Sequence, residues 1–419
     1  MSIRTRQTLS SSSVLAVVMA LSAAAPAYGA GFYIQEQSVT GLGRAFAGQA
    51  ADPLDASTVY SNPAGMTELG GPQISLGGHF LVPSLEVENE GTTRSGTAVS
   101  GNSSHNYTSA LVPNAYAAMP LTEDNRLWVG LGVSAPFGTV TEYEPTWFGR
   151  YDSIRSELLT IDVAPSVAYR LSDWLSVGGG IDIQYAKAEL SNAVPTGGPD
   201  ATSEVSGSDI SFGVNLGVQM RPWDGTSIGL HYRSQITHDI EGDATVSTIL
   251  GTTVADAGAE LNLPDIVGLG ISQQITPDLK ILGQVNWFNW SRFEEIRVET
   301  PTTTTVREQD YDDTFSVALG AEYSLTDTWT LRAGTQWDET PTVDSRRSTR
   351  IPDEDRIWLA FGASYNLNPN VSFDLGYAHV FYKTIEVDVT DTFTAGTIRT
   401  RAEFENQPNI FSAALRYRF

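Results

Sequence analysis

The sequence predicts an all-β protein: a transmembrane antiparallel β-barrel of about fourteen strands, plugged by an N-terminal hatch domain. Apolar or aromatic residues alternate with small or polar ones along most of the chain, which is the period-two pattern of strands. Many of these stretches run for roughly 10 to 15 residues, against about 5 or 6 for strands of globular sheets. The chain ends on an unbroken alternation that places Phe411, Ala413, Leu415, Tyr417 and Phe419 on one face, as in a strand that faces lipid.

The first 29 residues have the features of a secretory signal peptide. Arg4 and Arg6 precede an apolar stretch over residues 14–25, and the small residues Ala27 and Gly29 precede the expected cleavage site. A transmembrane anchor is the alternative. The apolar stretch is shorter than the about 20 residues that a helical span needs, so we expect a signal peptide.

Residues 30–71 differ from everything that follows them. They lack alternation and contain glycines, an Asp-Pro and an Asn-Pro, with short helical stretches at best. Such a segment before the first barrel strand is either a periplasmic tail or a plug. Because side chains alone do not fill a barrel of this size, we expect residues 30–71 to be a hatch inside a barrel formed by residues 72–419.

The strands of the barrel are expected in the alternating stretches, joined by tight turns on the periplasmic side and by longer acidic or Thr-rich segments outside. Tryptophans near strand ends suggest interfacial girdles, namely Trp174, Trp223, Trp287, Trp290, Trp329 and Trp358. The longer outer segments are 87–106, 143–155, 193–204, 242–259, 299–306 and 340–353. The expected strands are 72–86, 107–121, 126–142, 156–171, 173–192, 205–222, 224–241, 260–275, 277–298, 305–325, 327–339, 354–368, 369–391 and 396–419.

Composition argues against several function classes. The chain has 25 Lys and Arg against 49 Asp and Glu, a net charge of −24, so a nucleic-acid partner is not expected. It contains no Cys, which excludes thiol nucleophiles, Cys metal sites and disulfides. No metal-binding spacing or GxSxG nucleophile elbow is present, so we expect neither a cofactor, nor a metal, nor enzymatic activity. A lipid-acting barrel enzyme with a Ser–His pair across strands remains the different-class alternative.

Several motifs together resemble the FadL family of outer-membrane transporters for long-chain fatty acids and related hydrophobic compounds. Their order and spacing cover essentially the whole chain after residue 29. The motifs are Ala30-Gly31-Phe32, Gly41-Leu42-Gly43-Arg44-Ala45, Asn62-Pro63-Ala64, Leu263-Pro264-Asp265, Trp287 with Trp290-Ser291-Arg292-Phe293, and Arg350-Ile351-Pro352-Asp353-Glu354-Asp355-Arg356.

The resemblance implies where the protein is located and which route its ligand takes. The place is the outer membrane of a Gram-negative bacterium, where a monomer would sit among membrane lipid and lipopolysaccharide. The route begins with capture of a hydrophobic molecule outside and its entry into an apolar pocket. Hatch movement then releases the molecule sideways through a kinked strand, by passive diffusion.

The resemblance also implies ligand-binding residues. Arg307 is similar in position to a carboxylate-binding Lys of the family, although it could instead pair with Glu308 or Asp310. A second basic residue of the family's pocket is matched here by Asn192. That departure moves the role to Lys187 or fits a neutral hydrocarbon. Phe32 is expected to act as a pocket lid at the mature N-terminus.

Two further groups of residues have expected mechanical roles. Asn62, Pro63 and Ala64 could pin the hatch to the barrel wall, with Arg44 in the preceding hatch motif. A strand that contains Pro136, Phe137 and Gly138 should kink and part from its neighbour, because Pro donates no ladder hydrogen bond and Gly weakens strands. The family resemblance makes this kink a lateral opening.

Trp147, Phe148 and Tyr151 form a third group, an apolar patch that could capture ligand at the extracellular mouth; packing over the barrel rim is the alternative. For the whole protein, long-chain fatty acid is the leading substrate. Aromatic or alkane hydrocarbons on the same fold are the alternative, and a water-filled porin is less favoured because of the hatch.

Overall fold

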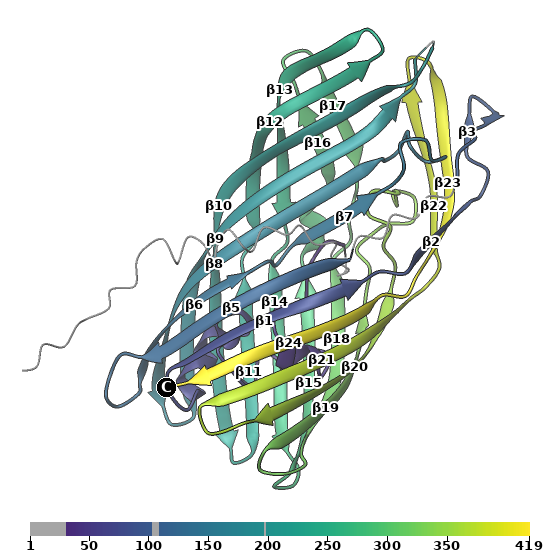
Figure 1. Cartoon of the computed structure of the whole chain (residues 1–419). Helices are drawn as coiled ribbons and strands as arrows, with labels where there is room; N and C mark the ends of the chain where they lie inside the picture. Colours follow the sequence, from purple (N-terminus) through teal and green to yellow (C-terminus); the bar gives the residue numbers. More distant parts are fainter. Residues whose placement is uncertain (1–30, 103–108, 197) are drawn as a thin grey trace, which may run out of the picture.

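The computed structural model describes residues 31–102, 109–196 and 198–419 (Figure 1). The predicted signal peptide, residues 1–29, lies outside this part. The described chain forms a closed antiparallel β-barrel whose strands are tilted, with the N-terminal segment drawn in purple inside it. No helix among the described residues is long and apolar enough to cross a membrane.

The barrel wall has fourteen positions in the described residues, each filled by one strand or by two strand segments in line, and we call each position a stave. This architecture confirms the predicted fold class. Five staves consist of two strand segments each. β1 pairs with β5 on one side and with β24 on the other, which closes the barrel without a free edge along most of its height. The staves are β1 (Gln73–Val82), β5 (Ala110–Pro120), β6 and β7 (Leu127–Ser134, Gly138–Glu142), β8 (Arg155–Ser172), β9 (Leu175–Val194), β10 (Ala201–Trp223), β11 and β12 (Thr226–Arg233, Ile236–Thr248), β14 and β13 (Ile266–Gln274, Gly251–Leu263), β15 and β16 (Leu279–Phe288, Glu295–Glu299), β18 and β17 (Thr314–Ser324, Thr304–Glu308), β19 (Trp329–Asp338), β20 (Arg356–Asn366), β21 (Val371–Tyr382) and β24 (Asn409–Arg418).

Alternation puts apolar side chains on the outside and small or polar ones inside. Phe212 on β10 is 65% exposed, while its neighbours in the interior register, such as Asn215 and Gln219, are buried. This is the pattern of strands that face lipid on one side. Trp174, Trp223 and Trp329 are exposed near the short turns, as expected for a girdle. The girdle assignment is wrong for Trp290 and Trp358, whose side chains are fully buried.

A second sheet of five strands stands at the end of the barrel opposite the short turns (Figure 1, beside the β22 and β23 labels). We call it the cap; it comprises β2 (Leu85–Asn89), β3 (Thr93–Arg94), β4 (Thr97–Ala98), β22 (Ile385–Phe393) and β23 (Gly396–Asn406). The predicted strands 369–391 and 396–419 were therefore each too long, because each joins a wall strand to a cap strand. Segment 87–106 contributes strands to the cap, and segment 242–259 is a hairpin of β12 and β13 rather than a loop.

Residues 31–69 lie inside the barrel and are almost entirely buried. They contain only short elements: α2 (Val39–Leu42), α3 (Thr58–Ser61) and the 3₁₀ helix η1 (Pro63–Glu68). We call residues 31–38 the upper hatch and residues 39–69 the lower hatch. The lower hatch approaches the wall at glycines. A methyl group on Gly229 would lie 1.8 Å from the Ala50 carbonyl oxygen, and one on Gly334 would lie 2.1 Å from that of Arg44.

Candidate functional site

The stave made of β6 and β7 is broken at residues 135–137. β5 pairs with β6 only from Ala115 to Pro120, and β7 pairs with β8 alone. Residues 110–114 of β5 pair with β1 on one side and with no described strand on the other. Pro113 fits this edge because proline has no N–H to leave unpaired. The wall therefore has a gap between β5 and β7, beside Pro136, Phe137 and Gly138.

The upper hatch closes this gap from inside. Tyr33 and Phe137 form an isolated antiparallel bridge. The Ile34 N–H donates to the Pro136 carbonyl at 2.8 Å, and the Gly138 N–H donates to the Phe32 carbonyl at 2.9 Å. These bonds replace the missing strand ladder, which matters because an unpaired backbone group at membrane depth is costly.

Side chains complete the seal. The Gln37 amide donates to the Ala135 carbonyl at 2.8 Å. The Thr160 hydroxyl accepts from the Phe137 N–H at 2.9 Å and donates to the Phe137 carbonyl at 2.6 Å. The remaining cavity at the gap has apolar walls that include Ile34 and Leu111, and its volume is about 20 Å³. That space holds one water molecule and no larger ligand, so the gap is closed in this structure.

Phe32 lies at the centre of an aromatic cluster just inside the gap. Its ring centroid is 4.7 Å from that of Trp290, 5.2 Å from that of Phe293 and 6.3 Å from that of Phe137, all edge-on. Phe32 is 1% exposed. Aromatic pairs in these geometries add to the free energy of simple burial. Other buried members of the cluster are Leu158, Ile236, Leu263, Ile266, Phe288 and Tyr311.

A second group of side chains, which we call the polar belt, consists of Arg307 of β17, Asp152, Asp391 of the cap strand β22 and Arg350. The guanidinium of Arg307 pairs with Asp391, with both distances at 2.7 Å, and with Asp152. Asp152 also accepts from the Thr349 N–H at 2.7 Å. Glu308 and Asp310, the alternative partners suggested by the sequence, pair with Arg346 instead. A carboxylate ligand would have to compete with two carboxylates already bound to Arg307.

Arg350 is the cation in this belt that has no carboxylate within salt-bridge distance among the described residues. It is 9% exposed, and its guanidinium donates to the Ser156 hydroxyl and to the Asn192 Oδ1, each at 3.3 Å. Burial and the neighbouring Arg307 lower the pKa of Arg350 to about 10. Its neighbour Ile351 packs against the aromatic cluster. Arg350 is therefore a buried, weakly partnered cation at the end of an apolar region.

The structure separates Lys187 from this site. On β9, Asp182, Gln184 and Ala186 are buried on the interior face, so Lys187 lies on the opposite face. Its ammonium is 3.6 Å from Glu189, and 40% of the side chain is exposed. Asn192 has the interior parity and contacts Arg350. The cation thus reaches the position beside Asn192 from the loop that follows β19 rather than from β9.

Trp147, Phe148 and Tyr151 are not an exposed patch. They are 0%, 0% and 3% exposed, respectively. Trp147 stacks on Tyr143 with ring centroids 3.9 Å apart. Trp147 and Phe148 pack beneath the apolar face of the cap, against Val87, Val387 and Phe404 among others. In this structure they form part of the core beneath the cap.

The lower hatch is held by hydrogen bonds and ion pairs to the wall. The Asn62 amide donates to the Ala50 carbonyl at 2.7 Å and to the Val218 carbonyl at 3.0 Å. Pro63 and Ala64 lie against Gly178 of β9. Arg44 pairs with Asp52 at 2.6 Å, and Asp52 also pairs with Lys280 of the wall at 2.8 Å.

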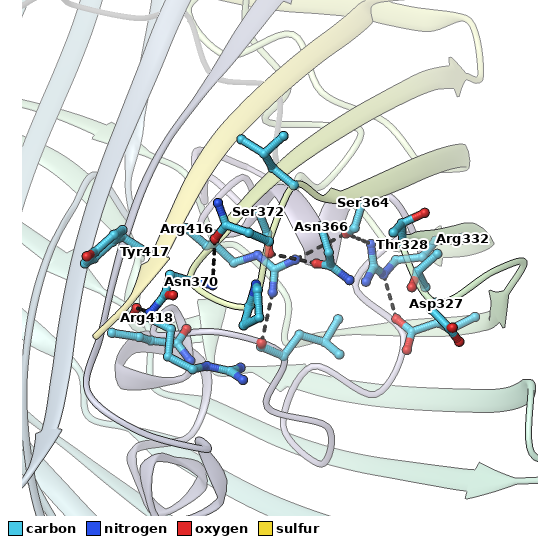
Figure 2. Close-up of a pocket in the computed structure, with 17 residues that line it drawn as sticks. Asp327, Thr328, Arg332, Ser364, Asn366, Asn370, Ser372, Arg416, Tyr417 and Arg418 are labelled. Carbon is cyan, nitrogen blue, oxygen red and sulfur yellow. Dashed lines mark hydrogen bonds and ion pairs between the residues drawn. The ribbon is translucent and has the colours of Figure 1, made fainter.

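Below the aromatic cluster the lumen is polar. Arg233 is 2.8 Å from Asp182 and 3.2 Å from Asp162, with all three side chains buried, and it lies 4.2 Å from the ring centroid of Tyr60. Nearer the short turns a cavity of about 550 Å³ is lined by Asn366, Asn370 and three arginines, Arg332, Arg416 and Arg418 (Figure 2). An apolar molecule would meet buried charges on this axial path and apolar side chains at the gap.

Comparison with known proteins identifies the architecture. The sequence matches the family model described as Outer membrane protein transport protein (OMPP1/FadL/TodX) over residues 19–419. The chain belongs to this family. It is therefore an outer-membrane transport protein of the FadL/TodX type, as predicted, and not an enzyme.

Individual relatives of this FadL/TodX family member span nearly its full length. It is 28% identical to the long-chain fatty acid transport protein of Escherichia coli O6:H1, over 99% of this chain and 100% of the relative. The crystal structure of a Pseudomonas aeruginosa FadL homologue matches with a TM-score of 0.86 at 24% identity, over 93% of this chain and 100% of that one. The crystal structure of the Ralstonia pickettii toluene transporter TbuX matches with a TM-score of 0.68 at 20% identity, over 94% and 98%.

Two features of this family member were missed by the sequence interpretation. Arg350 begins one of the family motifs, but it lies in a charge-dense loop with several acidic neighbours, so its local sequence does not mark it as a ligand-binding residue. Thr160 is one of many threonines, and its role depends on facing the kink from β8. Among the described residues, no group of three or more His, Asp or Glu is arranged to hold a metal ion.

Proposed function

We propose that this protein carries long-chain fatty acids across the outer membrane by passive diffusion, and that the ligand leaves sideways through the gap between β5 and β7. The observation that carries the proposal is the closure of this gap by the upper hatch, directly beside the aromatic cluster. Withdrawal of residues 31–34 would join the apolar interior to the apolar edge of the gap in one movement.

Arg350 supports the choice of a fatty acid. A fatty acid needs an apolar slot and one cation for its carboxylate. Arg350 has only two long hydrogen bonds to neutral side chains, whereas Arg307 is already paired with two carboxylates. We therefore assign the carboxylate-binding role to Arg350, with Arg307 and Asp152 orienting the polar belt around it.

A hydrocarbon is the second candidate. The aromatic cluster supplies apolar surface without requiring a charge, and Asn192 stands where the family pattern has a basic residue. Both candidates use the same exit. In the membrane we expect a monomer surrounded by outer-membrane lipid and lipopolysaccharide.

A disulfide lock tests the exit. Tyr33 and Phe137 are a non-hydrogen-bonded antiparallel pair, a geometry with Cα atoms about 4.5 Å apart, which a disulfide can bridge. The chain has no cysteine of its own, so Tyr33→Cys/Phe137→Cys would form a single defined crosslink. We expect oleate entry into proteoliposomes to stop on oxidation and to return on reduction. Each single variant is the control, and full entry through the oxidised double variant would refute hatch-gated exit.

Ligand binding tests the substrate. Titration of the detergent-solubilised protein with oleate and with toluene should give oleate binding that weakens about 10-fold or more in Arg350→Gln, because a hydrogen bond to a charged group contributes about 1.5 to 3 kcal/mol. Toluene binding should not change. Arg399→Gln is the matched control, because Arg399 is an exposed arginine of the cap that pairs with Asp388, and oleate binding should not change in it. Toluene binding without oleate binding would make the protein a hydrocarbon channel with the same exit.

A further inference from the structure

Glu36 is a buried acid of the upper hatch that has no hydrogen-bond partner. Its side chain is 0% exposed, and neither carboxylate oxygen has a partner among the described residues. It lies between Gln35 and Gln37, which bind the barrel. The Gln35 amide donates to Asp338 at 2.8 Å, and the Gln37 amide donates to the kink. Glu36 is thus fixed where the upper hatch meets the wall.

The surroundings of Glu36 contain more acids than bases. Arg356 of β20 and Asp338 of β19 act electrostatically on it from the wall, and Tyr33 lies near it on the hatch. Arg356 uses four of its five N–H groups on other partners. Its guanidinium bonds to Asp338 at 2.6 and 2.8 Å, to Asp353 at 3.0 Å and to the Tyr382 hydroxyl at 2.9 Å. One cation therefore serves two other buried carboxylates, and Glu36 accepts no hydrogen bond from it.

An ionised Glu36 in this position would be a buried charge without compensation, which a folded protein avoids by taking up a proton. Burial raises the pKa of Glu36 from 4.5 to about 7; Asp338 acts in the same direction, while nearby backbone N–H groups and Arg356 oppose it. The same cluster holds the hatch mechanically. Asp353 accepts from the Gly31 N–H at 2.9 Å, and Asp338 accepts from Gln35.

We propose that Glu36 is a proton-binding site of the upper hatch, which docks with Glu36 protonated and is released more readily once Glu36 ionises. The site needs no further ligand, because the proton removes the negative charge of Glu36 at the contact. On release the carboxylate gains water, while Arg356 keeps its bonds to Asp338 and Asp353. The upper hatch would then be a gate whose closed population depends on pH.

The direction of the effect follows from linkage. Glu36 has a higher pKa docked than exposed, so docking takes up a proton. The stabilisation of the docked state is complete below pH 4.5, the ordinary value, and is lost as pH rises to about 7. Above pH 7 no further change is expected. Acid therefore tightens the gate and neutral pH loosens it.

Hydrogen exchange on the detergent-solubilised full chain tests this. Exchange rates of residues 31–38, divided by the intrinsic rates at each pH, should show an opening constant that rises on the order of 100-fold between pH 4.5 and pH 8. Glu36→Gln keeps the shape but cannot ionise, and its opening constant should change about 10-fold less than that of the wild type over the same range. The change that remains comes from Asp338 and Asp353, which also bind the upper hatch and whose pKa values burial raises. Glu68→Gln is the matched control, because Glu68 is a hatch acid paired with Arg221 far from the gap. It should titrate like the wild type.

Either of two results would overturn the inference: an opening constant of the wild type that does not change with pH, or a Glu36→Gln variant whose opening constant changes with pH as much as that of the wild type. The transport consequence rests on the proposed function, but the exchange measurement does not. A pH-linked hatch in a protein that fails to carry oleate would refute the function and leave the proton site standing. Conversely, oleate transport with a pH-independent hatch would refute only the proton site.

Discussion

The upper and lower hatch lie in the same barrel, yet different contacts hold them. The lower hatch lays its backbone against wall glycines, and its charges are compensated in pairs such as Arg44 with Asp52. The upper hatch contacts the wall through one β-bridge, the ring of Phe32 and a cluster in which one acid has no partner. The lower hatch lies so close to the wall glycines that it has no room to move. The upper hatch is held by aromatic rings and one β-bridge, and these contacts can break together when it leaves the wall. The comparison indicates a fixed plug that carries a movable gate.

Truncating the ring that anchors the gate should have the largest effect. Phe32→Ala removes a fully buried ring from a packed cluster, a change that costs about 3 to 5 kcal/mol. The protection of residues 31–38 against hydrogen exchange should fall by about two orders of magnitude or more. The protection of the lower hatch should not change. Phe315→Ala is the control, since Phe315 is 47% exposed on the lipid-facing surface. If both parts of the hatch loosened together, they would be one unit and the comparison would fail.

Adding a methyl group at a wall glycine should destabilise the lower hatch rather than the upper hatch. In Gly229→Ala the new Cβ would lie 1.8 Å from the Ala50 carbonyl oxygen, so the lower hatch has to shift. Overpacking of this kind costs about 1 to 3 kcal/mol, which should lower the thermal unfolding midpoint and raise ion conductance in planar bilayers. Gly283→Ala adds the same methyl group where the nearest atom is 3.4 Å away and should behave like the wild type. If Gly229→Ala changed neither the unfolding midpoint nor the conductance, these contacts would not be what holds the lower hatch.

The sequence predicted the barrel well because lipid and lumen impose opposite chemistry on alternate residues. The alternation of apolar and polar residues in β24 is visible in the sequence itself. It also located the kink, since Pro136 and Gly138 interrupt a long strand. The cap could not be predicted, because β22 and β23 alternate just as wall strands do and nothing local says where the membrane ends. Trp147 was predicted in an exposed capture patch and Trp290 in an interfacial girdle, yet both are buried, because the local sequence does not show which other segments cover a tryptophan.

The site was predicted only in part for reasons of the same kind. Phe32 stands out directly after the predicted signal peptide, but the environment of a cation depends on which acids the fold brings to it. Arg307 finds Asp152 and Asp391 from distant segments, while Arg350, in a loop full of acids, finds none within ion-pair distance. Lys187 was excluded by strand parity, which depends on a register that a sequence alone does not fix.

Removing one hydroxyl group at the kink beside Phe137 should have a smaller effect and should test whether the wall helps to hold the upper hatch closed. The Thr160 hydroxyl bonds to both the N–H and the carbonyl of Phe137, so Thr160→Val keeps the shape and leaves two backbone groups of the kink without that partner. Hydrogen bonds of this type contribute about 0.5 to 1.5 kcal/mol each, and we expect exchange of the Phe137 and Gly138 amides to rise about 10-fold while oleate entry quickens. Thr335→Val is the control, because its hydroxyl bonds to the Trp358 carbonyl on the opposite part of the wall. Were Thr160→Val to slow entry without loosening the kink, β8 would guide the ligand rather than hold the gate shut.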